Sequence, residues 1–138
     1  MRRALLAVLV LGLWLVARGD KDKEKQGLRG QQPCVGVPSP IASPGFPAGF
    51  PEIGDVTWTA SQTAGPTQVV NGYTGDAIDD LFREMKEKFS EGGYSVSKSE
   101  RDAHDAEVNF QSAKNTGQVA LAEECQGRTS VRVTIRPA

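Results

Sequence analysis

Cysteine and histidine are scarce in this sequence, and their scarcity limits the chemistry available to the protein. The two cysteines, Cys34 and Cys125, allow at most one internal disulfide bridge and exclude a structural zinc site ligated by cysteines of this chain alone. If the chain is exported, pairing of the two is the natural expectation, with free buried cysteines or pairing between chains as alternatives. The single histidine, His104, has no nucleophilic partner motif, so it gives little reason to expect acid–base catalysis.

An excess of charge of either sign is also missing. Sixteen Lys and Arg residues stand against 17 Asp and Glu residues, for a formal net charge of −1. This balance gives no electrostatic case for nucleic-acid binding or for strong attraction to an anionic surface. We also find no catalytic signature and no cofactor-binding motif, so no cofactor is expected.

No apolar run reaches the length of about 20 residues that a membrane-spanning helix needs. The longest run covers residues 4–17, after the basic start Met1-Arg2-Arg3. A run of this length is typical of a signal-peptide core, and Ala17-Arg18-Gly19 fits a cleavage site before Asp20. We therefore expect residues 1–19 to be a signal peptide or a membrane anchor. The protein would then be secreted or held at the outer face of the cytoplasmic membrane. Basic residues after the run favour the third alternative, a cytoplasmic orientation.

Residues 20–51 have the composition of a linker. They begin with the alternating charges of DKDKEK, and six of the eight prolines follow between Pro33 and Pro51. Such a proline density excludes helix and central strand and predicts an extended, semi-rigid spacer. Phe46 and Phe50 are unusual in a spacer, and they suggest that part of it packs back onto the folded domain.

The stretch from Asp76 to Gly93 predicts an amphipathic helix. Its apolar residues recur at three- and four-residue spacing, and charged residues fill the opposite side. They are Ala77, Ile78, Leu81, Phe82, Met85 and Phe89. Asp76 is the expected N-terminal cap, and Gly92-Gly93 is the expected stop.

The remaining sequence predicts strands, most of them with alternating apolar and polar residues. The expected ranges are 55–60, 67–74, 94–98, 106–111, 118–124 and 129–136. We thus expect an α+β domain over residues 52–138, with one helix packed on a mainly antiparallel sheet of about six strands. The order along the chain is two strands, the helix and four strands. The helix is the only cover we expect for the apolar face. On the third strand, Tyr94, Val96 and Lys98 are expected to share one face.

Asp102, His104, Asp105 and Glu107 form the one cluster of metal-ligating residue types. On a strand, Asp105 and Glu107 project from one face and His104 from the other, so the side chains do not converge on one ion. A solvated turn is therefore the favoured interpretation, and a small metal-dependent protein using His104 with neighbouring carboxylates is one alternative for function. No metal site is predicted.

The outer face of the predicted sheet is the candidate interaction surface. It carries mixed polar side chains, chiefly Glu107, Asn109, Arg132, Thr134 and Arg136. Such a surface could bind a protein, a glycan or a peptidoglycan fragment, and it is also what any one-sided sheet shows to water. Trp58 is expected in the core, whereas Tyr73 is not securely placed on either face.

The segments FPEIGDVTWT, GPTQVVNGY, GYSVSKSERDAHDAEVNF, GQVALAEEC and RTSVRVTIRPA resemble small bacterial extracytoplasmic domains with no assigned activity. The resemblance covers residues 50–138 and implies fold and location, and it carries no site with it. We therefore expect a non-enzymatic binding or structural module of the cell envelope, whose partner is an unknown protein or envelope component. An uncleaved N-terminal segment would add contact with the membrane. A secreted enzyme inhibitor is the other alternative, for which only the segments 61–66 and 111–117 are long enough to serve as recognition loops.

Overall fold

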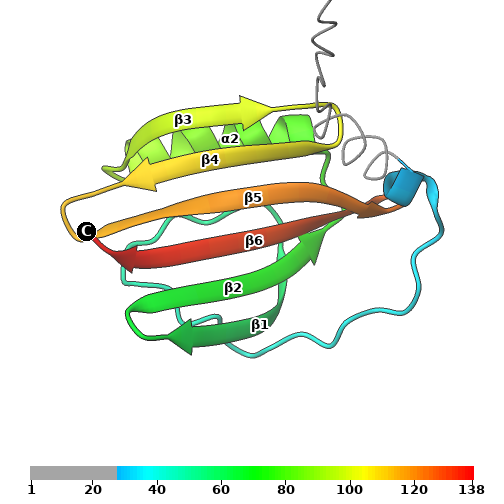
Figure 1. Ribbon diagram of the computed structural model, residues 1–138, viewed down its shortest axis with the longest axis horizontal. Helices are drawn as coiled ribbons and strands as arrows, with labels where there is room; N and C mark the ends of the chain where they lie inside the picture. The colour runs from blue at the N-terminus through cyan, green and yellow to red at the C-terminus, as the bar shows by residue number, and fades with distance from the viewer. Residues whose placement is uncertain (1–27) are drawn as a thin grey trace, which may run out of the picture.

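The computed structural model describes residues 28–138, in which helix α2 packs on a six-stranded sheet (Figure 1). The elements are β1 (Thr57–Ala64), β2 (Thr67–Thr74), α2 (Ile78–Glu91), β3 (Ser95–Arg101), β4 (Asp105–Gln111), β5 (Asn115–Cys125) and β6 (Arg128–Pro137). The prediction of an α+β fold with an antiparallel sheet is confirmed, because all five strand pairings are antiparallel. The predictions for residues 1–27, including the signal or anchor segment, lie outside the described residues.

The strands do not follow their chain order across the sheet. The order is β1-β2-β6-β5-β4-β3, which places the last strand in the interior between β2 and β5. Helix α2 connects β2 to β3 at the far edge and crosses one face of the sheet on the way (Figure 1). The sheet therefore has a covered inner face and an outer face that α2 does not contact.

Helix α2 buries most of the side chains that its spacing predicted, but Ala77 is exposed at the N-cap. Ile78, Leu81, Met85 and Phe89 are buried against the sheet, and Phe82 is only partly buried. The prediction for the start of the helix is wrong. Its N-cap is Ala77, which has no side-chain group that could cap the helix. The Asp76 carboxylate, expected to be the cap, instead accepts a hydrogen bond from the backbone amide of residue 55 at 3.2 Å.

The end of α2 is as predicted from the glycine pair. Gly93 adopts a φ of 83°, and the next amide, that of Tyr94, donates to the carbonyl of Phe89 at 2.9 Å. This left-handed turn is accessible to glycine without the penalty that a side chain would bring. It stops the helix and directs the chain into β3. In the last turns, the side-chain hydrogen bond from Lys88 to Glu84 raises the pKa of the Lys88 ammonium.

Residues 33–56, here called the arm, cover the part of the inner face that α2 leaves open. The Phe46 ring stacks on Phe50 with centroids 4.6 Å apart and meets the edge of Trp58 at 4.9 Å. Phe50 also contacts the rings of Phe89 and Phe110, at 5.4 and 5.6 Å. The expectation that the two linker aromatics pack back is confirmed, and Trp58, expected in the core, is partly buried and packs against it. The helix is thus not the only cover of the apolar face.

The arm reaches the inner face by passing around the outer edge of β1 (Figure 1). The Ile41 amide donates to the Trp58 carbonyl at 2.9 Å, and the Gln68 side-chain amide donates to the Pro44 carbonyl at the same distance. At its start, the arm is joined to the end of β5 by the disulfide between Cys34 and Cys125. Edge strands with unpaired backbone groups invite aggregation, and the arm protects part of this edge.

A β-bulge interrupts β3 at Lys98, so the alternation predicted for this strand does not hold at that residue. Ser97 pairs with Asn109 and Ser99 with Val108, so Lys98 is the extra residue between two aligned pairs. Its φ of 27° lies in the left-handed region, which non-glycine residues rarely adopt. Lys98 therefore does not share one face with Tyr94 and Val96 as the alternation predicted.

Candidate functional site

The outer face of the sheet is organised by β6, which occupies its interior. Along this strand, Thr129, Val131, Val133 and Ile135 are buried on the inner side. The alternate residues are Arg128, Ser130, Arg132, Thr134 and Arg136, and they face outward. Arginines therefore recur every fourth residue on one face, about 13 Å apart at the rise of an extended strand.

Arg128 is held by the protein itself. Its Nη1 donates to the Gly36 carbonyl at 2.8 Å, and its guanidinium lies 5.4 Å from the centre of the Tyr73 ring. Its Nε is 2.9 Å from the Glu124 carboxylate, and since this nitrogen makes no hydrogen bond in the described structure, the contact is an ion pair. These contacts fix the first part of the arm beside the sheet, and they also place Tyr73 at the end of the outer face.

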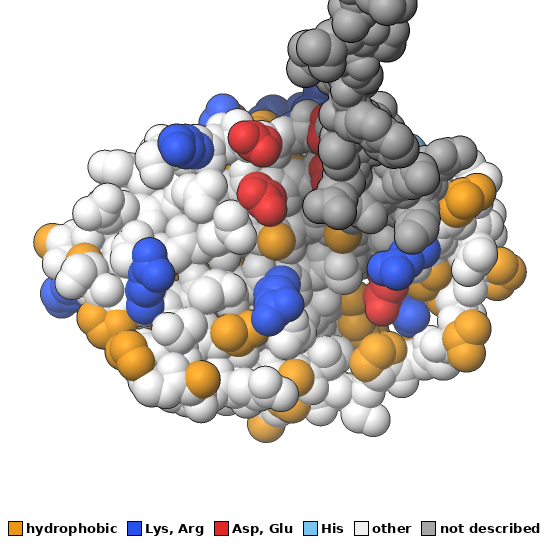
Figure 2. Space-filling model, viewed as in Figure 1, with side chains coloured by type: hydrophobic (Ala, Val, Ile, Leu, Met, Phe, Trp, Pro, Cys, Tyr) orange, Lys and Arg blue, Asp and Glu red, His pale blue; other side chains and the backbone are white. Residues whose placement is uncertain are grey.

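Arg132 and Arg136 are different, because neither forms an ion pair with any residue in the range 28–138. Arg132 stands between Asn71 of β2 and Ala120 of β5, and Arg136 is aligned with Thr116 of β5. Both arginine side chains are exposed. Figure 2 shows Lys and Arg side chains spread over this face, with Asp and Glu gathered mostly near β3 and β4. The interior of the outer face thus presents cations with neutral neighbours.

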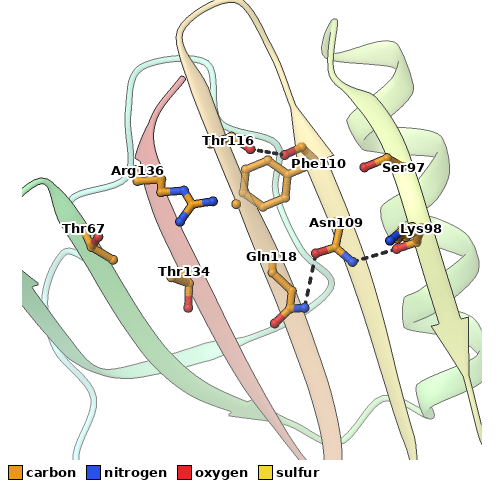
Figure 3. Close-up of a pocket in the computed structure, with 10 residues that line it drawn as sticks. Thr67, Ser97, Lys98, Asn109, Phe110, Thr116, Gln118, Thr134 and Arg136 are labelled. Atoms are coloured by element: carbon orange, nitrogen blue, oxygen red, sulfur yellow. Dashed lines mark hydrogen bonds between the residues drawn. The ribbon is translucent and has the colours of Figure 1, made fainter.

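A hollow of about 410 Å³ lies on the outer face beside Arg136. Its lining comes from β2 to β3 across the sheet: Thr67, Ser97, Lys98, Asn109, Phe110, Thr116, Gly117, Gln118, Thr134 and Arg136. Figure 3 shows the Arg136 side chain extending from β6 over β5 into this hollow, with Lys98 on the opposite side. Its volume is within the range of small-ligand sites, and its lining residues include Arg136 and Lys98 and no Asp or Glu.

Hydrogen bonds between side chains fix the floor of the hollow. The Gln118 side-chain amide donates to Asn109 Oδ1 at 3.2 Å and lies 3.3 Å from a Glu107 carboxylate oxygen. Asn109 Nδ2 in turn donates to the Lys98 carbonyl at 2.7 Å (Figure 3). The bulge at Lys98 is therefore held by a side chain of the neighbouring strand. A non-glycine residue in this conformation costs of order 1–3 kcal/mol and is found preferentially at functional sites.

Gly117 shapes the hollow from below. A Cβ atom at this position would lie 2.0 Å from the Thr134 carbonyl oxygen and 2.6 Å from the Phe110 ring. The space of a side chain is thus already occupied by a buried aromatic ring and by the backbone of β6. Glycine here is a packing requirement, not a conformational one.

Gly117→Ala is expected to lower the free energy of unfolding by roughly 1–3 kcal/mol, because the added methyl overlaps backbone that cannot move cheaply. Chemical denaturation of the two proteins measures the difference. Gly65→Ala is a control in which the new methyl meets open space, although its positive φ of 56° brings a conformational penalty of its own. A Gly117→Ala variant as stable as the wild type would show that β5 and β6 are not packed this closely.

The cluster around His104 does not converge as a metal site. His104 Nδ1 lies 2.8 Å from a Glu123 carboxylate oxygen, on a strand that the sequence had not linked to it. Among residues 28–138, no group of three or more His, Cys, Asp or Glu side chains could hold a metal ion. Asp105 and Glu107 instead project from β4, toward the outer face.

The two segments considered as recognition loops are shorter than expected. β1 continues to Ala64, which leaves a tight turn of Gly65 and Pro66, and only residues 112–114 separate β4 from β5. The expected end of the first strand at residue 60 is therefore wrong, because hairpin pairing with β2 extends the strand through the segment 61–64. Neither connection forms the long loop that an inhibitor of this kind would present.

All five residues predicted for the interaction face lie on the outer face, but the hollow includes only three of them. Asn109, Thr134 and Arg136 line it, whereas Glu107 and Arg132 lie on the next row of the sheet. Sequence reasoning missed Lys98, which the bulge moves to this face. It noted Gln118 only as one polar residue among many. The cross-strand pairing of Gln118 with Asn109 and Thr134 is what gives it a place in the site.

Comparison of the chain with known protein families, characterised proteins and solved structures finds no match. The resemblance to small extracytoplasmic domains therefore stays a prediction. No helix within residues 28–138 is long and apolar enough to cross a membrane.

Proposed function

We propose that this protein is a non-enzymatic binding module of the cell envelope, exported or membrane-anchored, that engages its partner with the outer face of its sheet. The observation that carries the proposal is the pair of exposed arginines, Arg132 and Arg136, which project from an interior strand and have no carboxylate partner in residues 28–138. Arginine in such a position is well suited to a partner's carboxylates, because its fork of donors matches their geometry.

Two further features support this proposal. The inner face is occupied by α2 and the arm, so the outer face is the broad sheet surface left for a partner. The disulfide is compatible with an oxidising compartment outside the cytoplasm, and the apolar segment over residues 4–17 supplies a route to it. The partner is a protein or another envelope component.

A pull-down from envelope extract, with the full chain as bait, tests the proposal. We expect a specific partner to be captured by the wild type and lost from an Arg132→Ala/Arg136→Ala variant, because both cations of the binding face are removed. An Arg83→Ala/Lys86→Ala variant is the matched control, since it removes the same charge from the exposed side of α2. Equal capture by all three proteins, or loss only with the α2 variant, would contradict binding through the outer face.

A further inference from the structure

We infer that the hollow between Arg136 and Lys98 is a carboxylate-binding site for a short peptide segment of the partner. The inference rests on the proposed function and goes one step further, since it names the chemical group that is bound and the place where it binds. The hollow is the point of the outer face where cationic, amide and hydroxyl side chains from several strands meet.

The charge of the site selects an anion. The Arg136 guanidinium extends over the hollow from β6, and Lys98 stands on its far side (Figure 3). Neither residue forms an ion pair within residues 28–138, so no described carboxylate neutralises them. Glu107 lies outside the lining, on the next row of the sheet, where its carboxylate accepts a hydrogen bond from Gln118 Nε2 at 3.3 Å. A carboxylate entering the hollow could take both donors of the guanidinium fork at once.

The position of Lys98 is built into the fold. Its left-handed φ of 27° is a conformation that lysine rarely adopts. Asn109 fixes the bulge by donating to the Lys98 carbonyl. The consequence of this arrangement is that a lysine lines the outer face at a place where regular alternation would have directed it inward.

The rest of the lining favours a peptide over a sugar or a nucleotide. Recognition of sugars and bases commonly uses an aromatic ring as a stacking surface. The one aromatic residue of the hollow, Phe110, is 1% exposed and cannot serve. Asn109 and Gln118 carry amide groups, and Thr116 and Thr134 carry hydroxyls, which match the alternating donors and acceptors of a peptide backbone.

Binding of defined probes to the full-length, isotopically labelled chain, followed by nuclear magnetic resonance titration, tests the inference. The probes are acetyl-trialanine with a free carboxylate, its C-terminal amide, an acetylated alanine tetrapeptide amide with one internal glutamate, glucuronate and inorganic phosphate. We expect the carboxylate peptides to shift the signals of Lys98, Asn109 and Gln118, and the neutral amide to leave them unchanged. Comparison of the two acids distinguishes a chain terminus from an acidic side chain as the source of the carboxylate.

Two variants locate the site. Arg136→Gln is expected to weaken binding of the acid peptides about tenfold or more, the cost of losing a charge-assisted pair. Arg83→Gln removes an exposed charge from α2, away from the hollow, and it is expected to change the affinity by less than about twofold, since exposed charges at such a separation are screened. Equal loss in both variants would indicate nonspecific attraction and would overturn the inference.

Other outcomes also decide against the site. Binding of the amide as tightly as the acid, preference for glucuronate or phosphate, or no shift at millimolar probe would each refute a peptide carboxylate site. If a partner is captured through Arg132 and Arg136 while none of these probes binds, the binding module stands and only the carboxylate site falls. If no partner is captured, the proposed function is refuted, whatever the result of the probe titrations.

Discussion

Replacing both Cys34 and Cys125 with serine is expected to lower the free energy of unfolding by about 4–5 kcal/mol. The bridge joins residues 91 positions apart, and closing a loop of that length lowers the entropy of the unfolded chain and so raises its free energy by about this much in the chain-entropy description. The loss is a large part of the 5–15 kcal/mol by which small domains are stable. The first part of the arm would remain attached through weaker contacts, among them the hydrogen bond from Arg128 to the Gly36 carbonyl.

Urea denaturation of the wild type and of the double-serine variant, each with and without reductant, measures this effect. Reductant is expected to destabilise the wild type to the level of the variant and to leave the variant unchanged, which separates the bridge from the substituted atoms. A difference below about 1 kcal/mol would mean that the bridge adds little, far less than the chain-entropy description gives.

Phe89→Ala is expected to cost about 3–5 kcal/mol, the usual range for deleting a fully buried aromatic ring. Phe89 is 0% exposed, and its ring contacts Phe110 at 4.8 Å and Phe50 at 5.4 Å. The cavity would therefore open at the point where the helix, the sheet and the arm meet.

Phe82→Ala on the same helix is the matched control. This ring is only partly buried, with the Lys86 ammonium 5.3 Å from its centre, so its removal should cost less than that of Phe89. Thermal and urea denaturation give both values. Equal costs for the two variants would contradict the position of Phe89 at the junction of the core.

Local sequence signals predicted the elements of the fold well. The three- and four-residue spacing identified the buried side of α2, and period-two alternation identified β4 and β6. Asp76 shows where such signals fail. Its carboxylate could cap the helix or accept a hydrogen bond from the amide of residue 55, and in the folded chain it accepts the bond from residue 55. Proline density likewise described the arm as extended, but it does not determine which surface an extended segment covers.

Long-range pairing was beyond the reach of the sequence. The position of β6 between β2 and β5 depends on contacts that no local pattern records. For the candidate site, alternation placed Arg132, Thr134 and Arg136 on one face, because their buried neighbours on β6 leave no other choice. The bulge at Lys98 could not be foreseen from alternation. The pattern assigns residues to the two faces in turn, and one extra residue in the strand places Lys98 on the opposite face from the one assigned.

Arginine-specific dicarbonyl labelling, read by peptide mass spectrometry in the presence and absence of the captured partner, tests most directly whether the outer face is the binding surface. Arg132 and Arg136 are expected to be labelled in the free protein and protected in the complex. Arg83, whose side chain is 69% exposed on α2, is expected to react equally in both and serves as the internal control. Protection of Arg83 with unchanged labelling of Arg132 and Arg136 would place the partner on the helix side and contradict the account.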